Sequence, residues 1–133
     1  MWPDSVERIA AFLRESSAHG RIEELPPGAD GPPGTGVLAA TFECDGRALV
    51  VLAPADGTID RDRLRRRAGC TDLQESAARG FPFQGARVLV DRSLLAVRTV
   101  WLEAGTPRHV LGLSPGQLLR LTHGETGRFL VQD

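Results

Sequence analysis

The sequence contains no lysine, no asparagine and no tyrosine, so all 16 of its basic residues are arginine. The absence of lysine excludes any mechanism that needs a lysine Schiff base, a lysine general base or the lysine of a phosphate-binding P-loop. An arginine-only set of cations is typical of a GC-rich coding sequence. The composition by itself therefore assigns no function.

Long apolar runs are also absent. No stretch approaches the ~20 residues of a membrane-spanning helix, and the start, MWPDSVERIAAFL, lacks the basic region and apolar core of a secretory signal. A net charge of −1 excludes the strongly basic surface of a protein that grips nucleic acid over a wide area. It still allows a partner that touches only one end of an RNA. We expect a cytoplasmic protein of one domain, residues 1–133, with no membrane or DNA partner.

The two cysteines, Cys44 and Cys70, lie far apart in the sequence. Two such residues predict neither a disulfide framework nor a zinc site, so we expect no metal. Cys44 stands beside Asp45 with no histidine near it in sequence, and it is not predicted to be a reactive thiol.

Periodicity and turn residues predict an α+β domain built around a mixed, largely antiparallel sheet. Asp45-Gly46 between two apolar runs is the clearest hairpin signal. Helix starts are expected at Asp4 with Glu7 as a capping pair, at Asp60, and at Ser114-Pro115. The predicted helices span residues 4–18, 61–68, 72–78 and 115–122, with one turn at 92–95. The predicted strands span residues 21–25, 37–44, 47–53, 87–91, 97–103, 108–113 and 127–131, and residues 28–36 form a loop.

Four segments, in order, resemble the YbaK/prolyl-tRNA-synthetase-associated (INS-like) family. They are Leu52–Asp60 followed by Leu64 and Gly69, Val88–Leu95, Val100–Pro107, and Leu113–Thr122. The first helix followed by Ile22–Pro26 is similar too, so the resemblance covers nearly the whole chain. It implies a barrel-like mixed sheet with flanking helices.

Members of that family are editing domains that hydrolyse the ester joining a wrong amino acid to a tRNA. The resemblance implies an aminoacyl-tRNA deacylase acting in trans on the 3′ end of an aminoacylated tRNA, with a synthetase as a further candidate partner. Such a hydrolase needs a pocket, backbone donors for the developing oxyanion and a placed water, and it needs no cofactor. A small pocket selects small amino acids by exclusion.

The sequence departs from the family pattern around this expected pocket. Ala39 stands where the family has a lysine, and Thr41 is the nearest polar residue left on that strand. The loop at residues 28–36 replaces a family helix. The family's glycine-proline loop is shortened to residues 80–85, which could still present the amides of Phe83 and Gly85. Glu103 stands where the family often has serine.

Glu103 and Thr41 are the candidate catalytic residues. The candidate binding residues are Ala39, Thr41, Gly80, Phe81, Pro82, Phe83, Gly85, Gly105, Thr106 and His109. Each of these residues also has a purely structural interpretation. Glu103 could be a solvated residue at the end of a strand, and His109 a strand residue without a functional role. Phe81 and Phe83 could simply fill the hydrophobic core. The arginines of residues 61–67 fit a solvated helix face as well as an RNA contact.

Two functions remain open at this point. One is the deacylase. The other is a catalytically lapsed member that binds a small molecule, a tRNA or a protein, which the lost charged anchor favours. A structural partner in a homodimer, formed through an exposed hairpin edge, is a third reading.

Overall fold

The computed structural model describes residues 1–131 of the chain. Within these residues the helices are α1 (Asp4–Glu15), α2 (Arg61–Ala68) and α3 (Pro115–Thr122), with a 3₁₀ turn η1 (Arg92–Ala96). The strands are β1 (Arg21–Glu24), β2 (Thr35–Cys44), β3 (Arg47–Pro54), β4 (Leu73–Glu75), β5 (Arg87–Asp91), β6 (Val100–Glu103), β7 (His109–Leu113) and β8 (Glu125–Gly127). No helix in this part of the chain is long and apolar enough to cross a membrane.

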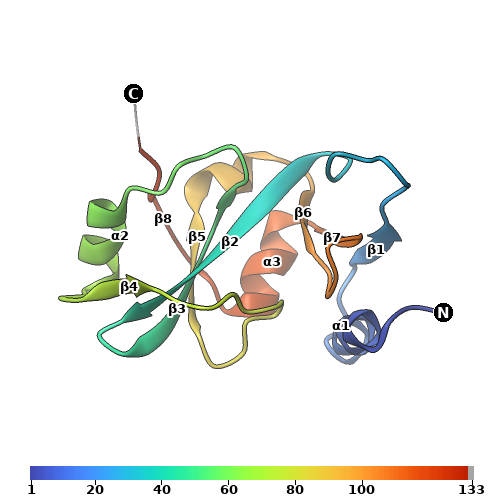
Figure 1. The fold of residues 1–133 in the computed structure, drawn as a ribbon, viewed down its shortest axis with the longest axis horizontal. Helices are drawn as coiled ribbons and strands as arrows, with labels where there is room; N and C mark the ends of the chain where they lie inside the picture. Colours follow the sequence, from blue (N-terminus) through green and yellow to red (C-terminus); the bar gives the residue numbers. More distant parts are fainter. Residues whose placement is uncertain (132–133) are drawn as a thin grey trace.

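The strands form one sheet in the order β1-β7-β6-β2-β3-β5-β8, with β4 added to the free edge of β2. Among residues 1–131 four strand pairings are antiparallel and three are parallel. This confirms the predicted α+β class with a mixed, largely antiparallel sheet. The long strand β2 crosses the middle of the molecule, with α1, β1, β6 and β7 toward one end and α2, β5 and β8 toward the other (Figure 1).

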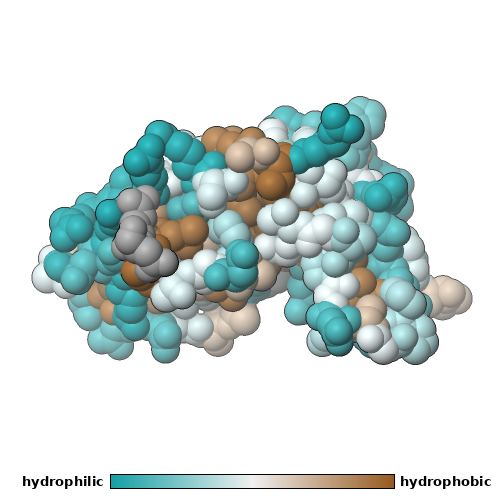
Figure 2. All heavy atoms as spheres, turned by 90° about the horizontal axis from the view of Figure 1, so that it is seen from above, coloured by the Kyte–Doolittle hydropathy of each residue, from teal (hydrophilic) through white to brown (hydrophobic). Residues whose placement is uncertain are grey.

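Strand β3 is the buried centre of the sheet, since the side chains from Leu49 to Ala53 are almost fully enclosed. One face of the sheet packs against α1 and α3, with Ile9 and Leu118 in that core. The other face packs around Leu64 of α2. The surface seen from above is mostly hydrophilic, with apolar atoms showing near its middle (Figure 2).

The local signals that the sequence carries are confirmed where a side chain or a glycine sets the backbone. Asp45 and Gly46 have φ values of 51° and 83°, the positive pair that a two-residue hairpin turn needs. The Asp60 carboxylate accepts hydrogen bonds from two backbone N–H groups of α2, and Gly69 ends that helix in the left-handed conformation. The Ser114 hydroxyl likewise caps α3 by accepting from the N–H of Gln117.

Three element predictions are wrong at their ends: the strand predicted at residues 97–103 begins only at Val100, and the first helix and the final strand also differ. The first helix starts after Pro3 with no side-chain cap, so Asp4 and Glu7 do not form the expected capping pair. It stops at Glu15, because the chain turns at Ser17, whose φ is 51°. The final strand is Glu125–Gly127, and the later residues contribute only a bridge between Ile59 and Leu130.

The predicted helix at residues 72–78 is also wrong, because the segment is the strand β4 and an extended connection. The N–H groups of Thr71 and Asp72 donate to the Asp45 carboxylate, with N···O distances of 2.7 to 3.1 Å. This contact places the following residues against the edge of β2, where Leu73 pairs with Cys44. The tertiary ladder overrides a weak local helix preference.

Cys44 and Cys70 form a disulfide, with Cα atoms 5.4 Å apart. The prediction of no disulfide is therefore wrong. Sequence spacing of 26 residues says nothing about proximity, and the pairing of β4 with β2 is what brings the two cysteines together. Disulfides are rare in the reducing cytosol. This bond therefore counts against the expected cytoplasmic location.

Removing the disulfide should destabilise the fold substantially. A bond closing a loop of this length contributes about 3 kcal/mol, chiefly by restricting the unfolded chain. We expect a Cys44→Ser/Cys70→Ser variant to lose about that free energy of unfolding in urea titrations. Wild-type protein in excess reductant should match the double variant, and the variant should not respond to reductant. An unchanged denaturation midpoint in the variant would contradict the assignment.

Candidate functional site

A gap along one edge of β2 creates the candidate site. At its start, Thr35 and Gly36 pair with β6, and at its end Phe42–Cys44 pair with β4. Residues 37–41 lie between these ladders with no strand beside them on that edge. A cavity of about 490 Å³ occupies this gap. Its lining combines β2, the end of β6 and the connection after β4, namely Val37, Leu38, Ala39, Ala78, Arg79, Gly80, Phe81, Phe83, Leu102, Glu103 and Gly105.

Ala39 presents a methyl group and its backbone to this cavity. The C=O of Gly36 accepts from Ala55 on the β3 side, whereas the C=O of Thr41 accepts from Ser76 on the opposite side. Backbone groups two residues apart in a strand point the same way. The N–H and C=O of Ala39 therefore point with those of Thr41, toward the edge that borders the cavity.

The connection after β4, residues 76–80, is called here the roof of the cavity, and Thr41 holds it in place. Its side chain is buried, its hydroxyl oxygen accepts from the N–H of Arg79 at 3.3 Å, and its carbonyl accepts from the N–H of Ser76 at 3.0 Å. Both contacts tie the segment after β4 to β2. Thr41 is absent from the cavity lining, and its geometry is that of a residue that positions the roof.

The 80–85 loop is anchored by aromatic packing. Phe81 and Phe83 are both buried, with ring centroids 6.0 Å apart in an edge-to-face arrangement, and both reach the cavity wall. Phe81 and Phe83 therefore do both: they fill the hydrophobic core and they form part of the cavity wall. The N–H of Phe83 donates to the C=O of Gly80 at 2.9 Å within the loop's own turn. That amide is therefore not free to meet a substrate carbonyl. Pro82 and Gly85 are absent from this cavity's lining.

The turn between β6 and β7 forms the opposite wall. Glu103 is exposed and forms no ion pair within residues 1–131. Gly105 has a φ of +95°, and a Cβ there would lie 2.9 Å from the backbone of Ser5. Only glycine therefore lets this turn pack on the start of α1.

Two predicted binding residues, Thr106 and His109, are not among the residues that line the cavity. His109 is buried, and its Nδ1 lies 2.6 Å from the Thr106 hydroxyl oxygen. Its ring meets Trp2 edge-on, with centroids 6.4 Å apart. These contacts are those of a histidine that fastens the N-terminal segment to the β6–β7 turn.

Arg79 is the cation of the site, and the sequence reasoning missed it. Its guanidinium donates to the C=O of Gln84 at 3.1 Å, and the residue lines the cavity from the roof. The sequence signal was present, since Arg79 directly precedes Gly80 of the predicted loop. Arg79 and Glu103 give the cavity one charge of each sign. Among the residues that the structure describes, no cluster of histidine, cysteine, aspartate and glutamate could hold a metal ion.

Comparisons with solved structures give the fold. A scaffold protein from work on epitope backbone grafting by computational design is 24% identical with a TM-score of 0.85, covering 99% of this chain and 100% of its own. A candidate trans-editing enzyme for prolyl-tRNA synthetase is 22% identical, with the same coverage and TM-score. A candidate signal transduction protein from Marinobacter aquaeolei VT8 is 18% identical with a TM-score of 0.74, and the chain spans 31% of its length.

No protein-family profile and no curated protein matches the sequence. At these identities the structural likeness shows the fold alone. The chain has the fold of the YbaK/prolyl-tRNA-synthetase-associated domains, as the resemblance of its motifs implied.

The Asp45 clamp, the hydrogen bonds from the N–H groups of Thr71 and Asp72 to the Asp45 carboxylate, should make the free energy of unfolding fall in acid. The N–H groups of Asp72 and Thr71 hold the pKa of the Asp45 carboxyl below its ordinary value. The ionised form is favoured in the native state, so its contribution is complete above about pH 3.9 and disappears as pH falls through the lowered native pKa. We expect Asp45→Asn to lose less unfolding free energy than wild type between neutral pH and pH 2. Exposed Asp56, changed to asparagine, is the control, and parallel wild-type and Asp45→Asn curves would contradict the clamp.

Removing the Thr41 hydroxyl should loosen the roof. A backbone N–H left without its partner costs about 1 kcal/mol or more. In Thr41→Val we expect the amides of residues 76–80 to exchange faster with deuterium, while Thr41→Ser, which keeps the acceptor, exchanges like wild type. The measurement is hydrogen exchange read by mass spectrometry. Equal protection in the valine and serine variants would show that the hydroxyl does not hold the roof.

Proposed function

We propose that this protein hydrolyses the ester bond between a small amino acid and the 3′ end of a tRNA, acting in trans. The observation that carries the proposal is the cavity bounded by Ala39, Gly80 and Gly105, with one carboxylate and one guanidinium among its lining residues. A candidate trans-editing enzyme shares the fold. We expect the substrate to come from the cytoplasmic tRNA pool, with a synthetase as a second partner.

The charges on the cavity match the two ends of such a substrate. The Glu103 carboxylate is suited to the ammonium group of the aminoacyl moiety. The Arg79 guanidinium is suited to a phosphate of the terminal nucleotide. Arginine binds phosphate through several donors in a fixed plane. It thereby retains the charge that Ala39 lacks, supplied from the roof in place of the strand.

The chemistry requires no covalent intermediate on the protein. Water adds to the ester carbonyl carbon, the carbon–oxygen bond to the ribose breaks, and the ribose oxygen takes the proton, leaving a free amino acid and a free 3′-terminal hydroxyl. The developing oxyanion needs donors fixed beforehand. The N–H of Ala39 is the donor best placed for it, since that of Phe83 is used within its own turn. In the related family the substrate's own ribose hydroxyl assists.

The walls suit a small side chain. The buried side chains of Phe81, Phe83 and Leu102 line the cavity together with Ala39. An apolar pocket discriminates by size, excluding what does not fit more sharply than it selects among what does. Small amino acids are therefore the expected cargo.

One observation favours a second candidate, a binding module without turnover. The N–H of Phe83 is occupied and no lysine exists in the chain, so the loop offers fewer donors than the resemblance implies. Such a module would bind a small molecule, a tRNA end or a protein at the same cavity.

The deciding experiment measures deacylation of a panel of tRNAs misacylated with small amino acids. Wild type should accelerate release from at least one of them. Glu103→Gln, which removes the charge and keeps the shape, should lower kcat/KM about tenfold, equivalent to about 1.4 kcal/mol of transition-state stabilisation. Ala39→Leu should abolish activity by filling the cavity. Glu43→Gln, on the exposed face of β2, is the matched control and should behave as wild type.

Rates equal to spontaneous ester hydrolysis for every tRNA would overturn the enzymatic proposal. If the same samples bind the aminoacylated tRNA, and Ala39→Leu abolishes that binding, the second candidate takes its place. A Glu103→Gln variant with wild-type kcat/KM would remove Glu103 from the mechanism.

A further inference from the structure

Two further hollows border the site cavity and share lining residues with it. The first, of about 570 Å³, shares Arg79 and Gly80 with the cavity and extends to Arg8 on α1. The second, of about 620 Å³, lies between the ends of α1 and α3. These two hollows share Phe12, Pro82, Phe83 and Gln84. Together they form one groove that passes around the 80–84 loop, which we call the long groove.

The charged residues that line the long groove are all basic. Neither of its two hollows has an aspartate or glutamate among its lining residues, although the chain contains 17 acidic residues. The linings include four arginines and a histidine, namely Arg8, Arg79, Arg87, Arg120 and His123. Arg87 is engaged by Glu125 at 2.9 Å. Arg8, Arg79 and Arg120 form no ion pair within residues 1–131.

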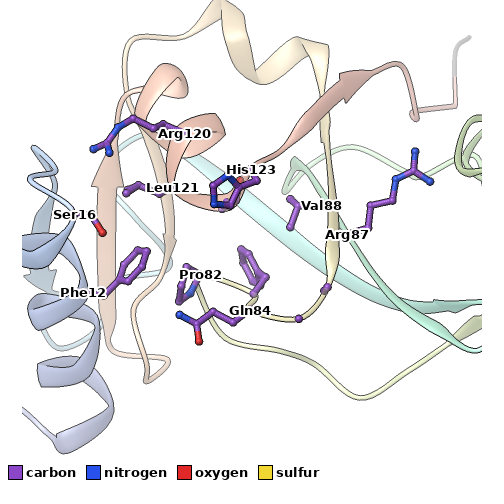
Figure 3. A pocket seen from close by; sticks show the side chains of 13 residues that line it. Phe12, Ser16, Pro82, Gln84, Arg87, Val88, Arg120, Leu121 and His123 are labelled. Carbon is purple, nitrogen blue, oxygen red and sulfur yellow. The ribbon is translucent and has the colours of Figure 1, made fainter.

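An apolar floor lies beneath these cations. Figure 3 shows Phe12 of α1 and Ser16 at the end of that helix across from Arg120 and Leu121 of α3, with Pro82 and Gln84 of the loop at the lower edge of the view. The ring of Phe12 meets Phe81 edge-on, with centroids 5.8 Å apart, which fixes its place at the floor. Cationic rims over aromatic and apolar floors are the usual construction of sites for single-stranded nucleic acid.

We infer that the long groove binds the single-stranded RNA that leads away from the ester site. Phosphates lie against Arg8 and Arg120, and bases lie over Phe12 and Pro82. The inference rests on the proposed function for the identity of the polyanion, because the groove begins at the cavity that would hold the esterified end. It gives a chain with net charge −1 a local cationic track. Binding through such a track does not require a basic protein.

The test is the salt dependence of binding to a short fluorescent single-stranded RNA, measured by anisotropy. For single strands the slope of log K against log salt is about −0.7 per neutralised phosphate. Arg8→Gln and Arg120→Gln should each reduce the magnitude of the slope by about 0.7. Arg14→Gln, on the same helix as Arg8 but absent from the linings of both hollows, should leave it unchanged. Wild-type slopes in both groove variants would overturn the inference, as would equally tight binding of an acidic peptide.

A second measurement separates this inference from the proposed function. In the groove variants, the KM for misacylated tRNA should rise by a larger factor than the KM for aminoacyl-adenosine, which carries none of the phosphates that the groove would hold. Equal changes in the two KM values would overturn the groove and leave the deacylase standing. If no substrate is hydrolysed but RNA binding still depends on Arg8 and Arg120, the groove stands and the enzymatic proposal fails.

Discussion

The site depends on β2 having two partners along one edge and a gap between them. Strand β3 covers the whole of the other edge from Val37 to Cys44, so β2 is held rigidly whatever happens opposite. The parallel contact with β6 lasts only two residues before the strands separate. Because β4 resumes the pairing at Phe42, the separation is bounded at both ends and becomes a cavity. An open edge would expose the same backbone to solvent and to other strands.

The roof over this gap has little regular structure, so its position depends on a few tethers at its two ends. Before β4, the disulfide and the Asp45 carboxylate fix Cys70–Asp72 beside the hairpin turn. After β4, the Thr41 hydroxyl holds Arg79, and the buried rings of Phe81 and Phe83 anchor the loop. The disulfide acts mainly on the unfolded chain, at about 3 kcal/mol, whereas the single hydrogen bond at Thr41 is worth about 1 kcal/mol. Global stability and the local order of the roof are thus governed by different groups.

Much of the fold was predictable because its signals are local. Asp45-Gly46, Asp60 with Gly69, and Ser114-Pro115 each set the backbone through their own side chain or lack of one. The failures are contacts between distant segments. The pairing of β4 with β2 brings Cys44 and Cys70 together, the Asp45 carboxylate holds the N–H groups of residues 71–72 beside it, and no periodicity encodes either contact.

The site was predictable in part for a different reason. Ala39, Gly80, Phe81, Phe83, Glu103 and Gly105 line one cavity, and the resemblance, with its ordered motifs, is what had grouped them. His109 was expected to face the pocket from the next strand and Thr106 to line it from the turn, but the His109 ring meets Trp2 and the Thr106 hydroxyl contacts the His109 ring. Thr41 lies next to the cavity and works through Arg79. Residue-by-residue transfer from a family cannot reveal that arrangement, since it is built on a loop that the family pattern does not match.

Arg79 gives the cavity a positive charge in a chain that contains no lysine. A lysine on β2 would enter the cavity from a rigid strand, as a point charge on a flexible stem. An arginine on the roof enters from the other side, and its own backbone is held by the strand position two residues after Ala39. Its guanidinium also donates to the C=O of Gln84 in the loop that follows. An arginine tethered at its backbone N–H and at its guanidinium thus supplies the positive charge of the cavity from outside β2.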